Sequence, residues 1–360
     1  MKKKMSKSAR NGFINYGLVI AAFFVLRLLV GAGKLSNSLQ SLLVPACCYM
    51  VMAVSLNLTV GILGELSLGH AGFMSLGAFS GIVTAVALQG AIPSVPLRLA
   101  LAMVVGALVG ALGGVIVGVP VLRLRGDYLA IVTLAFGQII KNIITVLYVG
   151  VDGKGLHIAL SNEALRLAEG GTTIIKGPMG AVGVTKLASF TAGFLLILIT
   201  LMVVQNLVNS RSGRAILALR DNRIAAESVG VNVIKYKLMA FVTSAALAGA
   251  AGALFGLNYS STVASKFDFN TSILVLVFVV LGGLGSIRGS LISAALLYVL
   301  PELLRSFDIA EYRMLIYAVV LILVMLCTNN PTLRSLIEGL KEKLGSQKAV
   351  REGKGGGANE

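Results

Sequence analysis

The chain has 360 residues, of which 56 % are hydrophobic and only 13 % are charged, and its mean hydropathy is +0.89. Because soluble domains carry about 25 % charged residues, this composition excludes a disordered chain and disfavours a soluble globular enzyme. It indicates a bundle of membrane helices. The excess of 31 Lys and Arg over 15 Asp and Glu, a net charge of +16, is typical either of nucleic-acid binding or of basic cytoplasmic loops.

Apolar stretches follow one another along most of the chain. A helix needs about 20 mostly apolar residues to cross a bilayer, and about ten stretches meet that need. They cover residues 13–30, 39–63, 67–88, 97–121, 128–149, 187–208, 238–258, 271–285, 289–304 and 312–328. The eighth and ninth are short and separated by glycines, which fits either two spans or a re-entrant pair packed inside protein. We therefore predict an all-α fold, a polytopic membrane bundle of about ten transmembrane helices.

The basic residues allow the two interpretations of the charge to be separated. The first ten residues hold five Lys or Arg and no acidic residue, and no convincing small-residue cleavage site follows 13–30, so we expect an uncleaved first helix with a cytoplasmic N-terminus. Counting spans from there places Arg123, Arg125, segment 211–237 and the tail beyond residue 334 on the same side. These are the other basic stretches, so the charge pattern favours membrane topology over nucleic-acid binding.

The spans define the expected domain organisation. Residues 1–12 form a basic cytoplasmic N-terminus, 13–330 a transmembrane domain, and 331–360 a cytoplasmic, partly disordered tail. Segment 150–186 contains Gly and Pro turn signals and is expected to be an external loop. Segment 209–236 is expected to be a cytoplasmic loop with one or two short amphipathic helices.

Residues for catalysis or metal binding are missing from the sequence. No Gly-x-x-x-x-Gly-Lys-Ser/Thr phosphate loop is present, so we expect no ATP hydrolysis by this chain. His70 and His157 are far apart, and Cys47, Cys48 and Cys327 lie in apolar runs without the spacing of a disulfide framework or zinc site. We predict no catalytic residue, no metal and no cofactor in this chain.

A glycine-rich polar interruption separates the second and third spans. Residues 56–78 read Leu-Asn-Leu-Thr-Val-Gly-Ile-Leu-Gly-Glu-Leu-Ser-Leu-Gly-His-Ala-Gly-Phe-Met-Ser-Leu-Gly-Ala. Broken helices at membrane depth occur where backbone is buried in protein or borders a cavity, and they often form transport sites. A simple cytoplasmic turn with a helix cap is the alternative. Glu65, Ser67 and His70 are candidates for a gate or an exit from such a site.

Lys141 is an ionisable residue inside the fifth span, and such residues are functional candidates because a charge in the bilayer is costly. It lies about 20 Å along the helix from Tyr128. Attraction of a substrate carboxylate is one interpretation. Extension of the side chain to the outer interface, or pairing within the bundle, is the other.

Four stretches, in order along residues 50 to 305, resemble the permease subunits of branched-chain amino acid ABC importers, of the LivM type more than the LivH type. They are 56–78, then 122–134 with its Arg-Leu-Arg-Gly-Asp-Tyr run, then 213–231, and finally 280–289 followed by 300–305. Two positions depart from the family pattern. Residues 151–156 replace its Thr-Gly-Gly-x-Asn-Gly-Leu, and Gln138 replaces a frequent acidic residue.

The resemblance implies a type II-like ABC importer permease for leucine, isoleucine and valine in the bacterial cytoplasmic membrane. The implied partners are a homologous LivH-type permease, two ATP-binding cassette subunits that hold ATP and Mg, and an extracytoplasmic substrate-binding protein. Loop 209–236 would dock into the ATPase. The expected coupling residues are Gly213, Arg214, Arg220, Asp221, Ala225, Ala226, Glu227 and Gly230. The expected residues of the translocation pathway are Asn57, Glu65, Ser67, His70, Tyr128, Thr133 and Lys141.

Three other functions remain open. The same architecture would serve a permease for urea, an amide or a sugar-like solute. A self-sufficient secondary transporter or channel would transport without ATP. A membrane enzyme is the weakest candidate because no catalytic constellation is present.

Overall fold

The computed structural model describes residues 7–33, 36–122, 127–152, 155–161, 165, 171–305, 318–319 and 322. Arg123 and Arg125, most of the predicted tenth span and the 331–360 tail lie outside the described residues. The chain divides into two compact units, residues 1–299 and 300–360. All the contacts reported below belong to the first unit.

The described chain is mostly helical, which confirms the predicted helical membrane bundle. The helices are α1 (Lys7–Gly31), α2 (Asn37–Asn57), α3 (His70–Ala87), α4 (Val95–Val121), α5 (Asp127–Val146), α6 (Phe190–Asn209), α7 (Arg211–Asp221), α8 (Arg223–Ser228), α9 (Val233–Gly256), α10 (Phe269–Gly282) and α11 (Ile287–Arg305). Three short helical segments are η1 (Leu58–Leu63, a π-helix), η2 (Gly177–Met179) and η3 (Ala264–Phe267).

Six helices in the described part of the chain are long and apolar enough to cross a membrane, and they identify a multi-pass membrane protein. They are Asn37–Leu63, His70–Ala87, Val95–Val121, Tyr128–Val146, Phe190–Asn209 and Val233–Gly256. The predicted count of ten is not confirmed. Helix α10, the predicted eighth span, has only 14 residues, or about 21 Å of helix against a hydrocarbon core of about 30 Å.

Helix α9 forms the centre of the bundle and packs against α2, α3 and α4. Glycines allow these backbones to approach closely. A methyl group added at Gly77 would lie 2.0 Å from the Gly249 carbonyl oxygen, and one at Gly110 would lie 2.6 Å from that of Ala245. Small residues at four-residue spacing therefore bring α3, α4 and α9 into backbone contact, the packing expected of small-xxx-small sequences in lipid.

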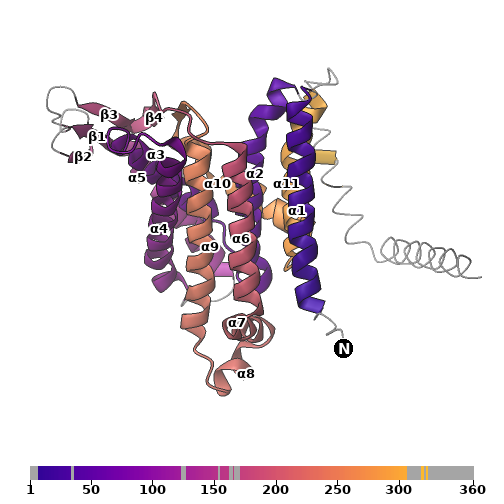
Figure 1. Cartoon of the computed structure of the whole chain (residues 1–360). Helices are drawn as coiled ribbons and strands as arrows, with labels where there is room; N and C mark the ends of the chain where they lie inside the picture. Colours follow the sequence, from indigo (N-terminus) through magenta and orange to yellow (C-terminus); the bar gives the residue numbers. More distant parts are fainter. Residues whose placement is uncertain are drawn as a thin grey trace, which may run out of the picture. The chain divides into compact units, whose positions relative to one another are not determined.

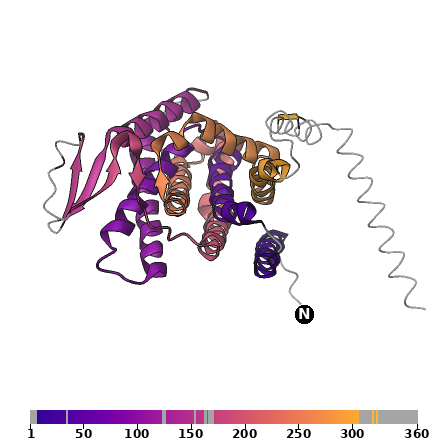
Figure 2. The same ribbon diagram turned by 90° about the horizontal axis from the view of Figure 1, so that it is seen from above.

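A five-stranded antiparallel sheet occupies one end of the bundle, and it was not predicted from the sequence. The strands are β1 (Tyr148–Asp152), β2 (Gly155–Ala159), β3 (Thr172–Lys176), β4 (Ala181–Val182) and β5 (Ser261–Thr262). Their order is β2-β1-β3-β4-β5. The predicted external loop thus folds into hairpins, and β5 joins it from the segment after α9. The strands lie at one margin of the bundle when it is viewed from above (Figure 2).

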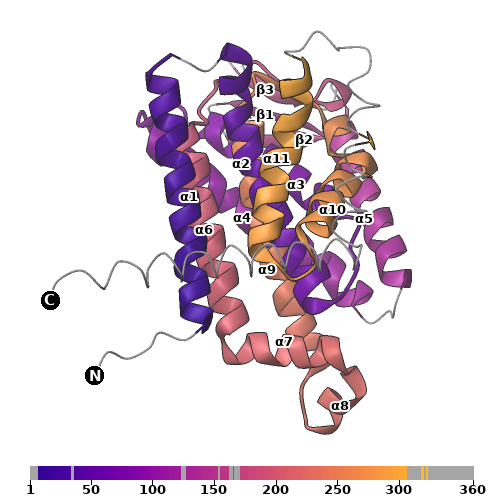
Figure 3. The same cartoon turned by 90° about the vertical axis from the view of Figure 1, so that its right-hand side faces the viewer.

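Helices α7 and α8 form the opposite end of the bundle from the sheet (Figure 1, Figure 3). Each turn into a new helix is capped by a polar side chain: Ser210 accepts from the Gly213 N–H, Asn222 from Ala225 and Asn232 from Lys235. Such caps satisfy amides that have no partner in the first turn of a helix. The two short helices predicted for 209–236 are confirmed.

Candidate functional site

The polar interruption between α2 and α3 is a break inside the bundle. The π-helix η1 ends at Gly64, whose φ of +80° is a left-handed conformation that glycine adopts without strain. Residues 65–69 form no regular helix, and α3 begins at His70. A π-helical turn is uncommon and is often found at functional sites, so the simple-turn alternative does not describe this segment.

His70 shows how far the break re-enters the bundle. Its Nε2 lies 2.8 Å from Oγ of Ser55, a residue eight positions before the end of η1 at Leu63, or about 10 Å back along the helix. Ser55 Oγ also lies 2.9 Å from the Met52 carbonyl oxygen, and the tautomer of His70 decides which of the two groups donates in the contact between Ser55 and His70. The Ser244 hydroxyl donates to the Ser55 carbonyl from α9.

Hydroxyl groups from two other helices satisfy the backbone of the break. Thr133 of α5 accepts from the Leu68 N–H at 3.1 Å, and Ser272 of α10 accepts from the Ala71 N–H at 3.1 Å. These amides have no helical partner, and an unpaired amide in an apolar interior is costly. Gly69 packs directly on α5, because a methyl group there would lie 2.1 Å from the Thr133 carbonyl oxygen. The break is therefore held by α5 and α10.

Asn57 and Ser67 are buried at this break with unused hydrogen-bonding capacity. Asn57 Oδ1 accepts from the Gly285 N–H at 2.8 Å, in the turn between α10 and α11. Its Nδ2 and the Ser67 hydroxyl have no partner among the described residues. Buried polar groups are normally paired, so these two atoms mark where a water molecule or a polar ligand would be accommodated.

Glu65 forms an ion pair with Lys237 of α9. Lys237 is buried and only 17 % of the Glu65 side chain is exposed. The pair connects the residue directly after Gly64 to the end of α9 that follows α8. Removing one partner would leave a largely buried charge without compensation.

Tyr128 and Lys141 do not join this group. Tyr128 is 71 % exposed at the start of α5, and Lys141 is half-buried two turns beyond Thr133. No ion pair of Lys141 occurs with the residues that the structure describes. The structure therefore brings together Asn57, Glu65, Ser67, His70 and Thr133 and leaves the other two candidates apart.

The predicted coupling residues divide into an exposed set and a buried set. Ala226 is 4 % exposed and packs with Leu219 and Val233 in a small core between α7, α8 and α9. Gly213 is also buried, because a methyl group there would lie 2.2 Å from the Val208 carbonyl oxygen. Both residues therefore shape the loop itself, and their role in coupling stays a prediction. The exposed set comprises Arg214, Arg220, Asp221, Ala225, Glu227 and Gly230.

Two exposed apolar residues of this loop were missed by the prediction. Ile224 is 80 % exposed and Val229 is 78 % exposed. They lie on and directly after α8, on either side of the buried Ala226. The sequence could have indicated this exposure. A helix as short as α8 buries one residue, Ala226, so its other apolar side chains must face outward.

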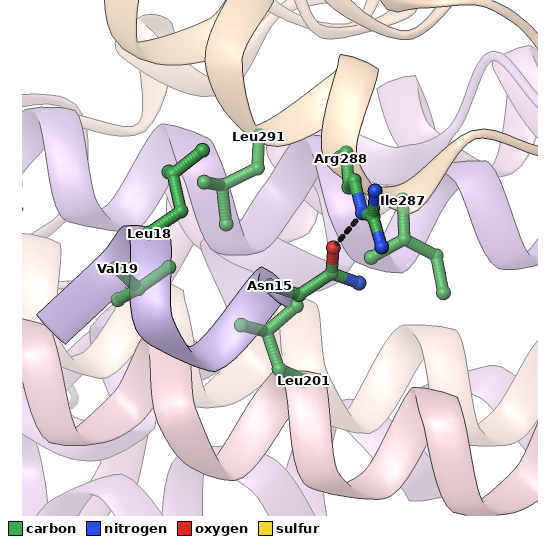
Figure 4. A pocket seen from close by; sticks show the side chains of 7 residues that line it. All are labelled: Asn15, Leu18, Val19, Leu201, Ile287, Arg288 and Leu291. Carbon is green, nitrogen blue, oxygen red and sulfur yellow. Dashed lines mark hydrogen bonds between the residues drawn. The ribbon is translucent and has the colours of Figure 1, made fainter. Parts of the chain in front are cut away.

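A shallow pocket lies away from the break, between α1, α6 and α11 (Figure 4). Its lining is aliphatic apart from Asn15 and Arg288, which are joined by a hydrogen bond from Arg288 Nε to Asn15 Oδ1. It contains no residue predicted for the pathway. Within the described ranges, no group of three or more His, Cys, Asp or Glu side chains is placed to hold a metal ion.

The hydroxyl of Thr133 provides a direct test of the break. Thr133→Val keeps the shape of the side chain but leaves the Leu68 amide unpaired, and we expect a loss of about 1–3 kcal/mol of stability. The measurement is the thermal midpoint of the purified protein in detergent. Thr145→Val is the matched control on the same helix, because the Thr145 hydroxyl bonds, among the described residues, to the Lys141 carbonyl of its own helix. Equal midpoints for the two variants would contradict the assigned role of Thr133.

Comparison with known proteins identifies the family. The family model for the branched-chain amino acid transport system / permease component matches residues 38–325, which is most of the chain. This chain belongs to that family. The expectation drawn from the four sequence stretches is thereby confirmed.

Individual relatives agree with this family assignment. This chain is 34 % identical over 316 residues to the high-affinity branched-chain amino acid transport system permease protein LivM of Salmonella typhimurium, and the match covers 83 % of this chain and 71 % of LivM. The LivH permease protein of the same organism is 33 % identical over 117 residues, covering 32 % of this chain and 38 % of LivH. The predicted preference for the LivM type is confirmed.

A sugar permease is also similar over a shorter region. The ribose import permease protein RbsC of Haemophilus influenzae is 27 % identical over 192 residues, covering 52 % of this permease and 55 % of RbsC. No solved structure matches the chain.

Proposed function

We propose that the permease is one of two membrane subunits of an ATP-driven importer for leucine, isoleucine and valine. The observation that carries this proposal is its similarity to LivM over 83 % of the chain. A LivH-type permease would be the second membrane subunit. Two ATP-binding cassette subunits would hold and hydrolyse ATP with Mg, and a substrate-binding protein would deliver the amino acid.

We propose that the permease lies in the bacterial cytoplasmic membrane with both termini in the cytoplasm. Helix α1 begins at the end of the bundle that carries α7 and α8 (Figure 1), and both regions are rich in Lys and Arg. Basic segments stay on the cytoplasmic side of a membrane. In this orientation the sheet is external. The transmembrane domain would cover residues 13–330, with 150–186 outside and 209–236 inside.

Loop 209–236 would be the contact with the ATPase. Exposed Ile224 and Val229 provide apolar anchors, and the same loop exposes the charged residues Arg214, Asp221 and Glu227. Apolar anchors within a polar rim are the usual anatomy of a protein interface. Binding of ATP would bring the ATPases together, and the loop would pass that movement to the bundle.

The polar break would be part of the translocation pathway. Asn57, Ser67, His70 and Thr133 are buried at or against the break, where the Ser55, Ser244 and Ser272 hydroxyls are buried as well. Broken helices with free polar groups are common in transport sites. Their hydroxyl, amide and imidazole groups would exchange bonds with a small zwitterion when the bundle opens.

Uptake by reconstituted vesicles tests the proposed function. The permease, purified with the subunits that accompany it from its native membrane, is expected to accumulate radiolabelled leucine only with ATP and the binding protein. Accumulation by this chain alone without ATP would instead identify a secondary transporter. A complex that hydrolyses ATP but transports none of the three amino acids would reject the proposed cargo.

A sugar is the second candidate cargo, because RbsC is similar over 52 % of this chain. Competition for uptake in the same vesicles, loaded with the binding protein, distinguishes an amino-acid cargo from a sugar cargo. Competition of leucine uptake by an excess of isoleucine but not of ribose supports the amino-acid cargo. The reverse result supports the sugar.

The apolar anchors of the loop give a separate prediction. Ile224→Ser together with Val229→Ser is expected to weaken ATPase binding by about tenfold or more, as for the central residues of an interface. Copurification of the ATPase with the permease is the measurement. Leu160→Ser is the matched control, since Leu160 is 72 % exposed at the sheet end. Undiminished copurification of the double variant would place the contact elsewhere.

A further inference from the structure

Arg220 of α7 is directed toward the bundle as well as toward solvent. Its Nη1 donates to the Gly61 carbonyl of η1 at 3.2 Å. Its Nε and Nη2 donate to Asp221 Oδ1 at 3.2 and 3.0 Å. Asp221 is 68 % exposed and Arg220 39 %, so the carboxylate holds the guanidinium on its outer side while the remaining donor reaches into the membrane domain.

The π-helix makes the Gly61 carbonyl available. The amides of Gly64 and Glu65 both bond to the Thr59 carbonyl, so the final turn leaves later carbonyls without helical donors. Carbonyls at the C-terminal end of a helix carry partial negative charge and favour a cationic donor. Arg220 supplies that donor from a helix 159 positions away in sequence.

Gly64 provides the space for the Arg220 side chain. A methyl group at position 64 would lie 2.7 Å from Cγ of Arg220. The left-handed φ of Gly64 also disfavours any larger residue. The aliphatic part of Arg220 therefore packs directly on the residue that ends η1.

Gly61 is also the contact point of the turn between α10 and α11. A methyl group at Gly61 would lie 2.1 Å from the Gly285 amide and 1.9 Å from Asn57 Oδ1. The amide and Oδ1 are themselves hydrogen-bonded. Arg220 therefore holds the segment of residues 61–65. The same segment packs on the buried Asn57 through Gly61 and forms the ion pair with Lys237 of α9 through Glu65.

We propose that Arg220 is a positioning residue that links α7 to the broken segment through the Gly61 carbonyl, and is not a contact with the ATPase. Displacement of α7 must either move Gly61 with it or break a charge-assisted hydrogen bond. Arg220 would therefore set how much of the loop's movement reaches the pathway. The proposal rests on the proposed function, because it needs an ATPase that moves α7.

The test compares variants in the assembled, reconstituted complex. Arg220→Gln is expected to copurify with the ATPases at the wild-type ratio and to lower the thermal midpoint no more than Thr133→Val, which also removes one hydrogen bond, while leucine uptake per ATP hydrolysed falls by about tenfold or more. Arg220→Lys retains a cationic donor and is expected to recover most of that coupling. Gly64→Ala displaces the Arg220 side chain without removing its charge and is expected to uncouple as Arg220→Gln does.

A matched charge removal distinguishes position from charge. Arg211 is exposed in the first turn of α7, and Arg211→Gln is expected to retain wild-type uptake per ATP. Loss of the ATPases from Arg220→Gln, or wild-type coupling in Arg220→Gln, would overturn the role of Arg220. A wild-type complex that shows no ATP-dependent uptake would overturn the proposed function, and the role of Arg220 with it.

Discussion

Replacement of Gly252 by alanine is expected to lower the stability of the bundle by about 3 kcal/mol or more, at the upper end of the costs of overpacking. The added methyl group would lie 1.9 Å from the Met74 carbonyl oxygen and 3.0 Å from the Ala78 amide nitrogen. Both are backbone atoms of α3, so no side chain can rotate away. Relief requires separation of α3 from α9, which is at the centre of the helix packing.

The yield of monodisperse protein in detergent and its thermal midpoint measure this effect. Gly17→Ala is the control, because Gly17 is also inside a helix but has nothing within 4 Å of the added methyl group. It is expected to stabilise α1 by about 0.5–1 kcal/mol, the ordinary gain of alanine over glycine in a helix. A wild-type midpoint for Gly252→Ala would show that α3 and α9 are not in backbone contact.

Breaking the ion pair between Glu65 and Lys237 is the second large effect. Lys237→Met leaves the carboxylate of Glu65 in a largely buried position, and Glu65→Met leaves a buried ammonium. Each is expected to cost about 3–5 kcal/mol, the penalty for an uncompensated buried charge. The double variant Glu65→Met, Lys237→Met removes both charges and is expected to recover most of the loss, because burial of the pair was itself costly.

Thermal midpoints of the wild type, both single variants and the double variant form a complete cycle. Glu227→Gln is the surface control. Its partner Arg223 lies 3.8 Å away, and 52 % of the Glu227 side chain is exposed, so we expect a change of at most about 0.5 kcal/mol. Additive losses in the double variant would show that Glu65 and Lys237 do not interact.

Local patterns were sufficient for the six described helices that are long and apolar enough to span a membrane and for the short helices of loop 209–236, but the predicted count of ten spans is not confirmed. Apolar runs predict the membrane-spanning helices. Ser210, Asn222 and Asn232 mark where α7, α8 and α9 begin, because each accepts a hydrogen bond from an amide in the first turn of its helix. Strands β1 to β4 lie within residues 148–182, where the Gly and Pro turn signals were interpreted only as an external loop, and β5 comes from a distant segment. β4 pairs with β5, which follows α9, through Ala181 and Thr262. No local pattern records such a pairing.

The candidate site was predicted in part. The break between 64 and 69 was evident from its glycines, and Asn57, Glu65, Ser67 and His70 were named from it. Their distant partners were not, because Lys237 lies 172 positions from Glu65 and Gly285 lies 228 positions from Asn57. Ser272, which accepts from the Ala71 amide beside His70, lies 201 positions from Ala71. A lone serine inside an apolar helix gives no indication of which helix it faces.

The low charged fraction and the placement of the +16 charge determined by themselves that this is a membrane bundle with a basic face, because burial in lipid constrains composition directly. Family membership also followed from the order of motifs in the chain. Tertiary structure alone decided that Arg220 reaches Gly61, that Ala226 is buried in the loop, and that Glu65 meets Lys237. These three contacts depend on which helix faces meet when helices pack closely at glycine residues. That geometry is a property of the whole bundle.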